Sequence, residues 1–488
     1  MQGTFPQIPF GKRGTLRASA SMLTLTASML AISTQSHAKN WEFSPYVGVE
    51  EQFTDNARSS TTDEESDFIT TVNVGFSLNG ETRRSEFSTS YNISQDYYAR
   101  NHDLDGYRQR FLGEGTLELL EDKFFIDARA TFTEENLGQT GSTSATDRTQ
   151  AEDRTQVFNG QISPYYIHNF GGWATGIARY SYSETIFSES DVGASSSSTP
   201  DRHTNEYQAS LTSGRRFAKV AWGVDTRFTA SEAEDGAEFS HLLVSGNGQL
   251  PLNRLFSLIG TVGYDEFDDQ DFDDEEISGV FGGAGVRFHP SSRTDASLQA
   301  GYRFGEIVYE MTAEYAPTSA DIISSSYKTS VQTADQTLAN TDLFDAYGDL
   351  VRPEFNVTSY VEDVTKSDRF ELSWSRRMER NSYGLSAAYI EREILADDTE
   401  DKTISIRGNF GRSLTPRARI SFNGGYSEVL EGQTPGDEDK TYTFGANYSY
   451  QFGNGLSGSI SYNFLNRDNP TGDDLTENAL SLSLRKSF

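Results

Sequence analysis

The sequence predicts an all-β fold, a transmembrane antiparallel up-and-down β-barrel of about 22 strands, within a range of about 20 to 24. Short periplasmic turns and long acidic outer loops are expected to join the strands. Three observations carry this prediction. The N-terminus has the pattern of an export signal, apolar residues alternate with polar ones over long stretches, and short connections alternate regularly with long ones.

The N-terminal segment has the three parts of a secretory signal peptide. Lys12, Arg13 and Arg17 precede a mostly apolar stretch at residues 22–32, and small residues lead up to Ala38. We expect cleavage between Ala38 and Lys39, which divides the chain into a signal peptide at 1–38 and an outer-membrane barrel at 39–488. The alternative, a short amphipathic anchor, is too short to span a bilayer.

Composition argues against several classes of protein. The chain has 41 Lys and Arg against 72 Asp and Glu, a formal charge of −31, whereas nucleic-acid binding needs a basic face. The mean hydropathy is −0.58 and no run of about 18 apolar residues occurs, so we expect no transmembrane helix. There is no cysteine, so we expect neither disulfides nor a lipoprotein anchor. Tyr and Phe are numerous, as the interface girdles of a barrel require.

The apolar residues follow the strand period of two rather than the helical period of 3.6. From Phe68 to Leu78 every second residue is apolar or Thr, and Asn73, Gly75 and Ser77 lie between them. The same alternation recurs at residues 220–230, 442–450, 456–464 and 480–484. Because the bilayer core has no water to satisfy unpaired backbone groups, a sheet there must close on itself.

The connections between these segments alternate in length, and this alternation is the most informative feature of the chain. Short turns are expected at residues 79–81, 121–123, 170–172, 253–254, 289–292, 317–319, 416–417 and 453–455, and a very short outer loop at 303–306. Long polar loops are expected between them, at residues 54–66, 136–155, 188–203, 268–276, 333–355 and 431–440. Short periplasmic turns and longer outer loops are typical of bacterial outer-membrane barrels.

Charged residues on the polar faces of the expected strands should point into the lumen. An Arg or Lys on the lipid face near the midplane would cost about 2 to 4 kcal/mol. The candidate lumen-facing charges are Arg108, Arg110, Glu114, Glu118, Asp127, Arg129, Asp225 and Arg227. A soluble barrel or sandwich that exposes these residues to bulk water is the alternative.

No constellation of residues predicts a catalytic, cofactor or metal site, so we expect a non-enzymatic protein without a cofactor. His241 follows Ser240, but adjacent strand residues face opposite sides and cannot share a proton. The acidic run at residues 268–276 has the carboxylates that calcium prefers. It lacks the glycine and spacing of an EF-hand loop, so a solvated loop is the favoured interpretation.

The lumen of so wide a barrel is either filled or open. Outer-membrane transporters of this size hold a plug, whereas only Lys39 and Asn40 precede the first expected strand after cleavage. We therefore expect an open pore, or a constriction formed by the loop at 335–355, whose apolar residues include Leu343, Phe344 and Tyr347. Capping of the outer rim by that loop is an equal alternative.

The C-terminus has the alternating apolar pattern with which barrels are presented to their assembly machinery. Leu480, Leu482, Leu484 and the terminal Phe488 follow this pattern. Lys486 departs from it, because an apolar residue usually occupies that position.

Four segments together resemble one family of barrels. They are PYVGVEEQFTDN at residues 45–56, DFITTVNVGF at 67–76, GVRFHPSSRT at 285–294 and SSSYKTSV at 324–331. They are similar to outer-membrane β-barrels associated with exopolysaccharide and PEP-CTERM (exosortase) gene systems. The resemblance runs over nearly the whole mature chain and implies a bacterial outer-membrane location and a role in passing or organising extracellular polysaccharide. It carries over no catalytic residues.

The functional hypothesis is therefore a non-enzymatic, porin-like channel or assembly component in the outer membrane of a Gram-negative bacterium, linked to exopolysaccharide export. A structural or adhesive surface barrel without transport is one alternative, and a secreted soluble β-protein is another. Expected partners are outer-membrane lipid, lipopolysaccharide and the barrel-assembly machinery. Polysaccharide, or divalent cations at the acidic loops, remain open as further partners, and nucleic acid is not expected.

Overall fold

The computed structural model describes most of the chain from residue 40 onward. The described residues are 40–136, 145–146, 148, 154–189, 200–269, 277–333, 364–396, 399–432, 438–470, 472 and 474–488. Ala38 and Lys39 lie outside them, so the signal peptide remains a prediction. Among the described residues, no helix has the length and apolar composition that crossing a bilayer requires.

The described chain is almost entirely β-strand, with two 3-10 turns, η1 (His102–Leu104) and η2 (Arg215–Phe217). The strands are β1 (Asn40–Thr54), β2 (Asp67–Glu81), β3 (Ser85–Tyr98), β4 (Gly106–Leu120), β5 (Phe124–Asn136), β6 (Arg154–Asn169), β7 (Ala174–Glu189), β8 (Arg202–Ser213), β9 (Ala221–Ala233), β10 (Glu238–Pro251) and β11 (Phe256–Asp269). They continue with β12 (Gly279–Ser291), β13 (Thr294–Arg303), β14 (Glu306–Tyr315), β15 (Asp321–Gln332), β16 (Thr365–Arg377), β17 (Asn381–Ile394), β18 (Thr399–Thr415), β19 (Ala418–Glu431), β20 (Lys440–Gly453), β21 (Leu456–Asp468) and β22 (Leu475–Ser487).

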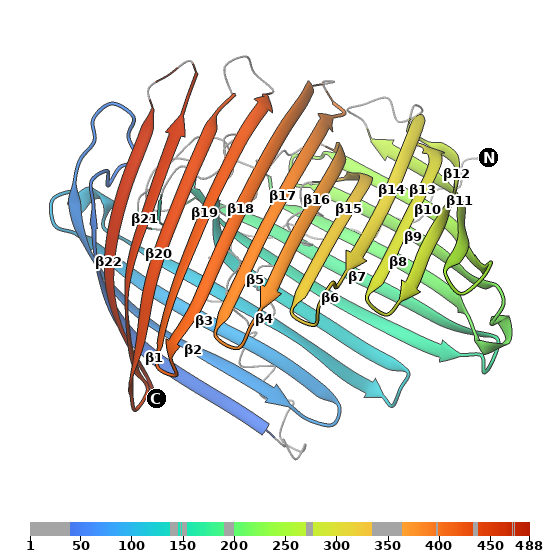
Figure 1. Ribbon diagram of the computed structural model, residues 1–488, viewed down its shortest axis with the longest axis horizontal. Coiled ribbons are helices and arrows are strands. Elements are labelled where there is room, and N and C mark those ends of the chain that lie inside the picture. Colours follow the sequence, from blue (N-terminus) through green and yellow to red (C-terminus); the bar gives the residue numbers. More distant parts are fainter. Residues whose placement is uncertain are drawn as a thin grey trace.

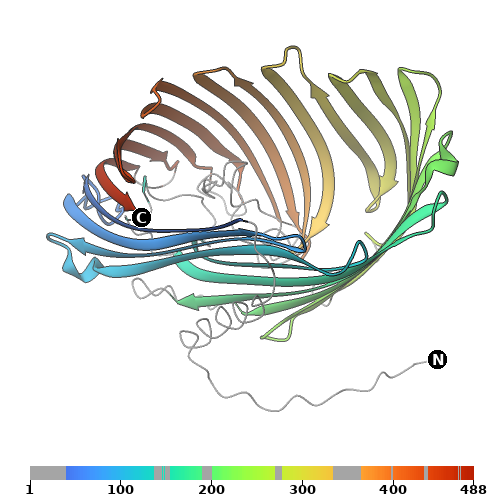
Figure 2. The same cartoon turned by 90° about the horizontal axis from the view of Figure 1, so that it is seen from below.

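The sheet closes on itself. Each strand pairs antiparallel with its neighbours in the sequence, and β1 pairs with both β2 and β22. The closing register runs from Tyr46 opposite Ser487 to Thr54 opposite Ala479. Figures 1 and 2 show the resulting wall, which is flattened in cross-section. The prediction of an all-β, up-and-down barrel is confirmed, with 22 strands in one sheet.

The connections alternate as expected, and two turns lie a few residues later than predicted. The turn expected at 79–81 lies at 82–84, where Thr82 Oγ1 accepts a hydrogen bond from the backbone N–H of Ser85 at 2.9 Å. Gly80 instead belongs to β2, where a Cβ would lie 2.4 Å from the Phe87 ring. The turn expected at 289–292 moves to 292–293, because β12 continues through Pro290 by means of a bulge.

The outer face of the sheet is apolar and unpacked. Val262 is 61% exposed and Leu482 56%, and many other large side chains on that face are similarly open. Rings form rows along it, such as Trp374, Tyr383, Phe410 and Phe422, with successive centroids 6.4, 5.1 and 6.3 Å apart. So large an apolar surface with aromatic rows fits a bilayer and its interfaces rather than water. The closed sheet and this face locate the protein in an outer membrane, so a secreted soluble β-protein does not fit.

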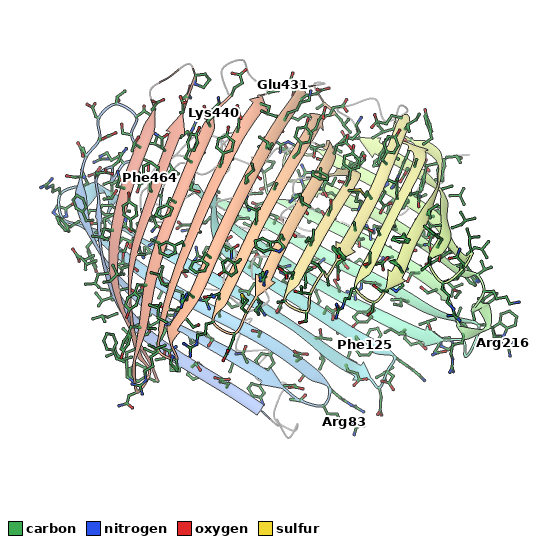
Figure 3. The ribbon with its side chains drawn as sticks, viewed as in Figure 1. Arg83, Phe125, Arg216, Glu431, Lys440 and Phe464 are labelled. Carbon is green, nitrogen blue, oxygen red and sulfur yellow. The ribbon has the colours of Figure 1, made fainter. Side chains whose placement is uncertain are left out.

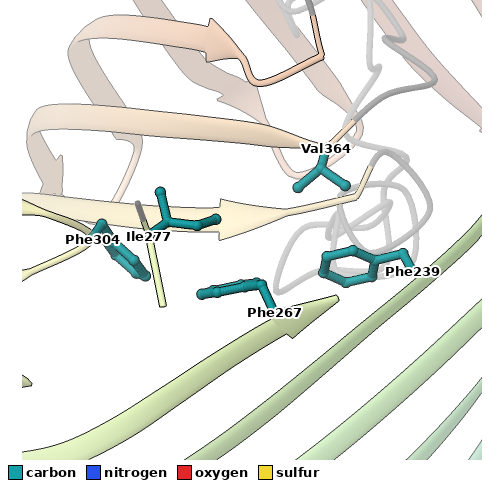
Figure 4. Close-up of a cluster of buried hydrophobic side chains, with 5 residues drawn as sticks. All are labelled: Phe239, Phe267, Ile277, Phe304 and Val364. Carbon is teal, nitrogen blue, oxygen red and sulfur yellow. The ribbon is translucent and has the colours of Figure 1, made fainter. Parts of the chain in front are cut away.

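The two ends of the barrel differ. Most turns of two or a few residues lie at one end, with Arg83 and Arg216 near them, and Glu431 and Lys440 lie at the other end, where most of the longer connections are (Figure 3). The two-residue loop of Phe304 and Gly305 also belongs to that second end. We call these the turn end and the loop end. The buried apolar side chains form two small clusters, one of Phe239, Phe267, Ile277, Phe304 and Val364 (Figure 4), and one of Ala57, Ile69, Tyr98 and Leu104.

Candidate functional site: the inner wall of the barrel

The predicted charges of β4 share one face of that strand. Arg108, Arg110, Glu114 and Glu118 alternate with Tyr107, Leu117 and Leu119, which are exposed on the outer face. Arg108 Nε lies 2.8 Å from Asp96 Oδ2 of β3, and Thr71 Oγ1 of β2 donates to Asp96 Oδ1 at 2.5 Å. Strand pleating thus turns these side chains away from the apolar surface.

The predicted charges of β5 join a network across four strands. Arg129 lies directly opposite Glu114 in the register. Asp127 Oδ1 accepts a hydrogen bond from Thr116 Oγ1 at 2.9 Å, and Asp127 Oδ2 lies 2.9 Å from Arg179 Nη1 of β7. The Arg179 guanidinium lies 4.1 Å from the centroid of the Tyr165 ring.

On β9, Val224 and Phe228 are exposed on the apolar face, and Asp225 and Arg227 lie on the other face of the strand. Asn247 Nδ2 lies 3.5 Å from Asp225 Oδ2, and Arg227 Nε lies 3.7 Å from Glu206 Oε2. These longer distances make the β9 contacts weaker than those around Asp96 and Asp127.

Pairing of arginine with aspartate recurs around the whole inner wall, at positions that sequence reasoning did not single out. Arg303 contacts Asp265 at 2.7 Å and Arg467 contacts Asp439 at 2.6 Å. Two further pairs have closely bonded partners, Arg287 with Asp295 and Arg392 with Asp401. Because each guanidinium faces a carboxylate, the charges cancel locally. At these positions the wall therefore carries little net charge.

Between these pairs the wall carries hydroxyl and amide groups that bond across adjacent strands. Ser163 lies 2.8 Å from Ser181, Asn159 donates to Thr185 at 2.9 Å, and Thr204 donates to Ser231 at 2.9 Å. Similar pairs occur on the opposite wall, Ser324 with Ser373 at 2.6 Å and Ser459 with Ser483 at 2.7 Å. The inner surface is thus polar and rich in small neutral groups.

One inner-wall cluster near the loop end combines aromatic rings with charge. Asp265, 1% exposed, accepts two hydrogen bonds from Arg303, at 2.7 and 2.9 Å, and lies 2.9 Å from His241 Nε2. The His241 ring stacks on Phe267 with centroids 4.1 Å apart. Ser240 belongs to the other face of β10, opposite Asp268 in register, so the expectation that Ser240 and His241 point apart agrees with the pairing.

Phe304 completes this cluster from an unusual backbone conformation. It has φ +57°, and Gly305 has φ +77°, which together make the two-residue loop predicted at 303–306. A bulky side chain rarely adopts positive φ, but two-residue hairpin loops need it. Phe304 is 7% exposed. Its ring centroid lies 4.5 Å from the Arg303 guanidinium and 6.1 Å from the ring centroid of Phe267. Packing of the ring therefore offsets the strain.

The C-terminal residues lie at the seam where the sheet closes. Leu480, Leu482 and Leu484 are exposed on the apolar face, and the backbone N–H of Phe488 donates to Pro45 O at 3.0 Å. Lys486, which departs from the usual pattern, bends its ammonium to the Asn454 carbonyl and lies 5.2 Å from the Phe488 ring centroid. A long stem with a charged tip suits the polar edge of a bilayer. Recognition of this terminus by assembly machinery remains a prediction.

At the loop end, a polar cluster around Arg58 lies outside the strands. Arg58 Nη2 lies 2.7 Å from Asp103 Oδ2 and 3.2 Å from Asn101 Oδ1, and Arg58 Nε lies 3.3 Å from Glu65 Oε2. The hydrogen bond from Arg58 lowers the pKa of the Asp103 carboxyl below its ordinary value. This network ties the β1–β2 connection to η1.

Two predicted features lie wholly or partly outside the described residues. Only Asp268 and Asp269 of the acidic run at 268–276 are described, and the expected constriction loop at 335–355 lies outside the described residues. Within the described ranges, no three His, Cys, Asp or Glu side chains gather as a metal site would require.

Comparison with known proteins shows the fold. No protein-family model and no curated protein matches the sequence. Among solved structures, the chain is similar to a ferric enterobactin receptor of Pseudomonas aeruginosa (TM-score 0.51, 10% identity, 92% of this chain and 80% of that one). It is also similar to a siderophore receptor of Acinetobacter baumannii (TM-score 0.51, 8% identity, 92% and 80%). A third is an iron transporter of Neisseria meningitidis (TM-score 0.50, 12% identity, 93% and 83%). These likenesses agree with the 22-stranded outer-membrane barrel described above.

Proposed function

We propose that the protein is a non-enzymatic outer-membrane channel for a polar, largely uncharged solute, and that the solute is extracellular polysaccharide or its fragments. The observation that carries the proposal is the chemistry of the inner wall. Many of its arginines face aspartates, and hydroxyl and amide side chains lie between these pairs.

The wall chemistry favours a neutral, hydroxyl-rich solute over an ionic one. A pathway for anions would present arginine or lysine side chains without carboxylate partners. A pathway for cations would present aspartate or glutamate side chains without basic partners. Hydroxyl and amide side chains can exchange hydrogen bonds with sugar hydroxyls as they do with water. The resemblance of residues 45–56 and 67–76 to barrels of exopolysaccharide gene systems supports the same substrate class.

The test is solute passage by the purified, reconstituted protein. In planar bilayers we expect stable single-channel steps, and in liposome swelling we expect neutral oligosaccharides to enter faster than anionic solutes of equal size. Absence of channel steps at high protein load would overturn the channel and favour the structural or adhesive alternative.

A second experiment tests the substrate class separately. A deletion strain is scored for capsule and exopolysaccharide, with complementation by the intact gene as the control. Normal export in the deletion strain would remove the polysaccharide part of the proposal. Because the similar solved structures include siderophore and iron receptors, ferric enterobactin belongs in the solute panel. Its preferential uptake would overturn the neutral-solute proposal.

A further inference from the structure

Three residues of the β5–β6 connection lie against the inner wall of distant strands. The Arg148 guanidinium contacts Glu50 of β1 with two nitrogens, at 2.7 and 2.9 Å, and donates to Gln52 Oε1 at 2.9 Å. Gln52 Nε2 donates to Thr146 Oγ1 at 3.0 Å. The backbone N–H of Ala145 donates to Glu477 Oε2 of β22 at 2.8 Å.

These contacts are far from the hairpin to which the three residues belong. In the closed sheet β1 lies four strand positions from β5, the nearer strand of that hairpin, and β22 lies one position beyond β1. Four strand spacings amount to about 19 Å around the wall. The hydroxyl of Tyr98 on β3 also bonds the Arg148 carbonyl, so the contacts extend over β22, β1 and β3. Ala145, Thr146 and Arg148 therefore do not simply extend the β5–β6 hairpin above the rim.

Burial of the wall beneath them supports the same conclusion. Gln52, Thr54 and Glu477 are 0% exposed, although polar side chains inside so wide a barrel would otherwise be open to water. Their polar groups are instead bonded, because Thr54 Oγ1 donates to Glu477 Oε1 at 3.3 Å and Ser481 Oγ donates to Gln52 Oε1 at 3.3 Å. The wall is built to receive a polar segment at this place.

We propose that Ala145, Thr146 and Arg148 form a strap that covers the seam from inside and narrows the loop-end half of the lumen, with the Glu50–Arg148 pair as its releasable anchor. Glu50 and Gln52 belong to the loop-end part of β1, which ends at Thr54, so the strap lies on the path of any solute entering there. The side chains of Glu50 and Arg148 are each 17% exposed, so water can still reach the pair. Partial access lets the anchor open without unfolding the barrel.

The first test is cross-linking of introduced cysteines. The chain has no cysteine of its own, so only the introduced thiols can react. In the full-length protein in outer membranes, we expect the Gln52→Cys, Thr146→Cys pair to be joined efficiently by a short bis-thiol reagent. This pair leaves Glu50, Arg148 and Glu477 intact. The control pair, Asn247→Cys with Thr146→Cys, places its second thiol on β10 and should stay unlinked. Equal linking of the two pairs, or none, would overturn the strap.

The second test measures release of the anchor. A single Thr146→Cys reports access to a membrane-impermeant maleimide, and Arg148→Ala should raise its reaction rate about tenfold, since hydrogen bonds to a charged group are lost. Arg227→Ala, which removes an inner-wall arginine beside Glu206 on another strand pair, should leave the rate unchanged. Glu50→Gln should give a smaller rise than Arg148→Ala, because it keeps one acceptor oxygen.

Folding of each variant is checked by its heat-dependent shift on a denaturing gel. An unchanged maleimide rate in folded Arg148→Ala and Glu50→Gln would overturn the anchor. Neither thiol readout depends on transport. The strap can thus fail while the channel proposal stands, and the reverse also holds. If both stand, Arg148→Ala should in addition raise single-channel conductance.

Discussion

Two regions of the inner wall bury a carboxylate, and they do so in different ways. At the seam, the Glu477 carboxylate accepts hydrogen bonds from the Thr54 hydroxyl and from the backbone N–H of Ala145, which lies more than 300 residues away in the sequence. At β10–β13, Asp265 is held by Arg303 and His241 from nearby strands, inside a cluster of rings. The seam is thus polar and depends on a distant segment, whereas the β10–β13 region is packed with rings, and its carboxylate takes its partners from nearby strands.

The difference predicts how strongly a substitution in each region destabilises the barrel. Removing a group from the packed region leaves a cavity between rings or a guanidinium without its carboxylate. Removing one from the seam lets a neighbouring hydroxyl or amide group take over the hydrogen bond. We therefore expect larger losses of stability at β10–β13 than at the seam.

The largest effect is expected for Phe267→Ala. Phe267 is 2% exposed and packs against His241, Phe239 and Phe304, so truncation leaves a cavity between rings. The free energy of unfolding should fall by about 4 kcal/mol, measured by urea unfolding of the protein folded in liposomes. The matched outward control is Val262→Ala, whose side chain is 61% exposed. An equal loss in both variants would contradict the packed cluster.

Asp265→Ala should come next. The substitution leaves Arg303 facing rings without its carboxylate, and because Arg303 is partly open to water we expect a loss of about 3 kcal/mol in the same assay. Arg303→Met in the same background should restore part of the loss, since an apolar side chain suits the rings. If the double variant is no more stable than Asp265→Ala, the unpaired guanidinium is not the cause.

At the seam, Glu477→Gln should cost only about 1 kcal/mol, because the amide oxygen can still accept from Ala145 or Thr54. Glu477→Leu keeps the size and removes both acceptors, so its loss should be larger. A loss for Glu477→Gln as large as that for Asp265→Ala would remove the contrast between the two regions.

The smallest effect concerns the exposed Arg58–Asp103 pair at the loop end. Asp103 has a pKa lowered by its hydrogen bond from Arg58, so its stabilising contribution is present above the unfolded value, about 3.9. The contribution is lost as pH falls through the lower folded pKa. Hydrogen exchange of the Ala57 amide, bonded to Glu65 O at 2.7 Å, should speed up there beyond its intrinsic pH dependence. Asp103→Asn should show no such acid-dependent step.

The alternation of residues was enough to predict the strands and their approximate number. Successive side chains of a strand point to opposite sides, so Arg108 and Tyr107 must diverge whatever the rest of the chain does. The turn at 121–123 was predicted correctly from its polar residues. Gly80 was predicted in a turn but lies in β2, because a glycine can mark a close contact with a ring as well as a turn.

The partners of the inner charges could not be predicted in the same way. Arg303 and Asp265 lie 38 residues apart on strands separated by β12, and only the register and the stagger of the closed sheet bring them together. The contacts of the proposed strap were still harder to predict, because residues 136–155 have the polar composition of an ordinary outer loop. The loop at 335–355, considered as a constriction or as a cap of the outer rim, lies outside the described residues, whereas Thr146 and Arg148 make described contacts with the inner wall.

By itself, then, the sequence determined that this protein is a closed membrane barrel with an apolar outside and a polar inside, because those features follow from a local period and from the absence of water in a bilayer. Only the tertiary structure decided which charges neutralise each other, where Phe304 packs, and which connection lies against the wall. These depend on closure between β1 and β22, a contact between the two ends of the barrel sequence that no local pattern encodes.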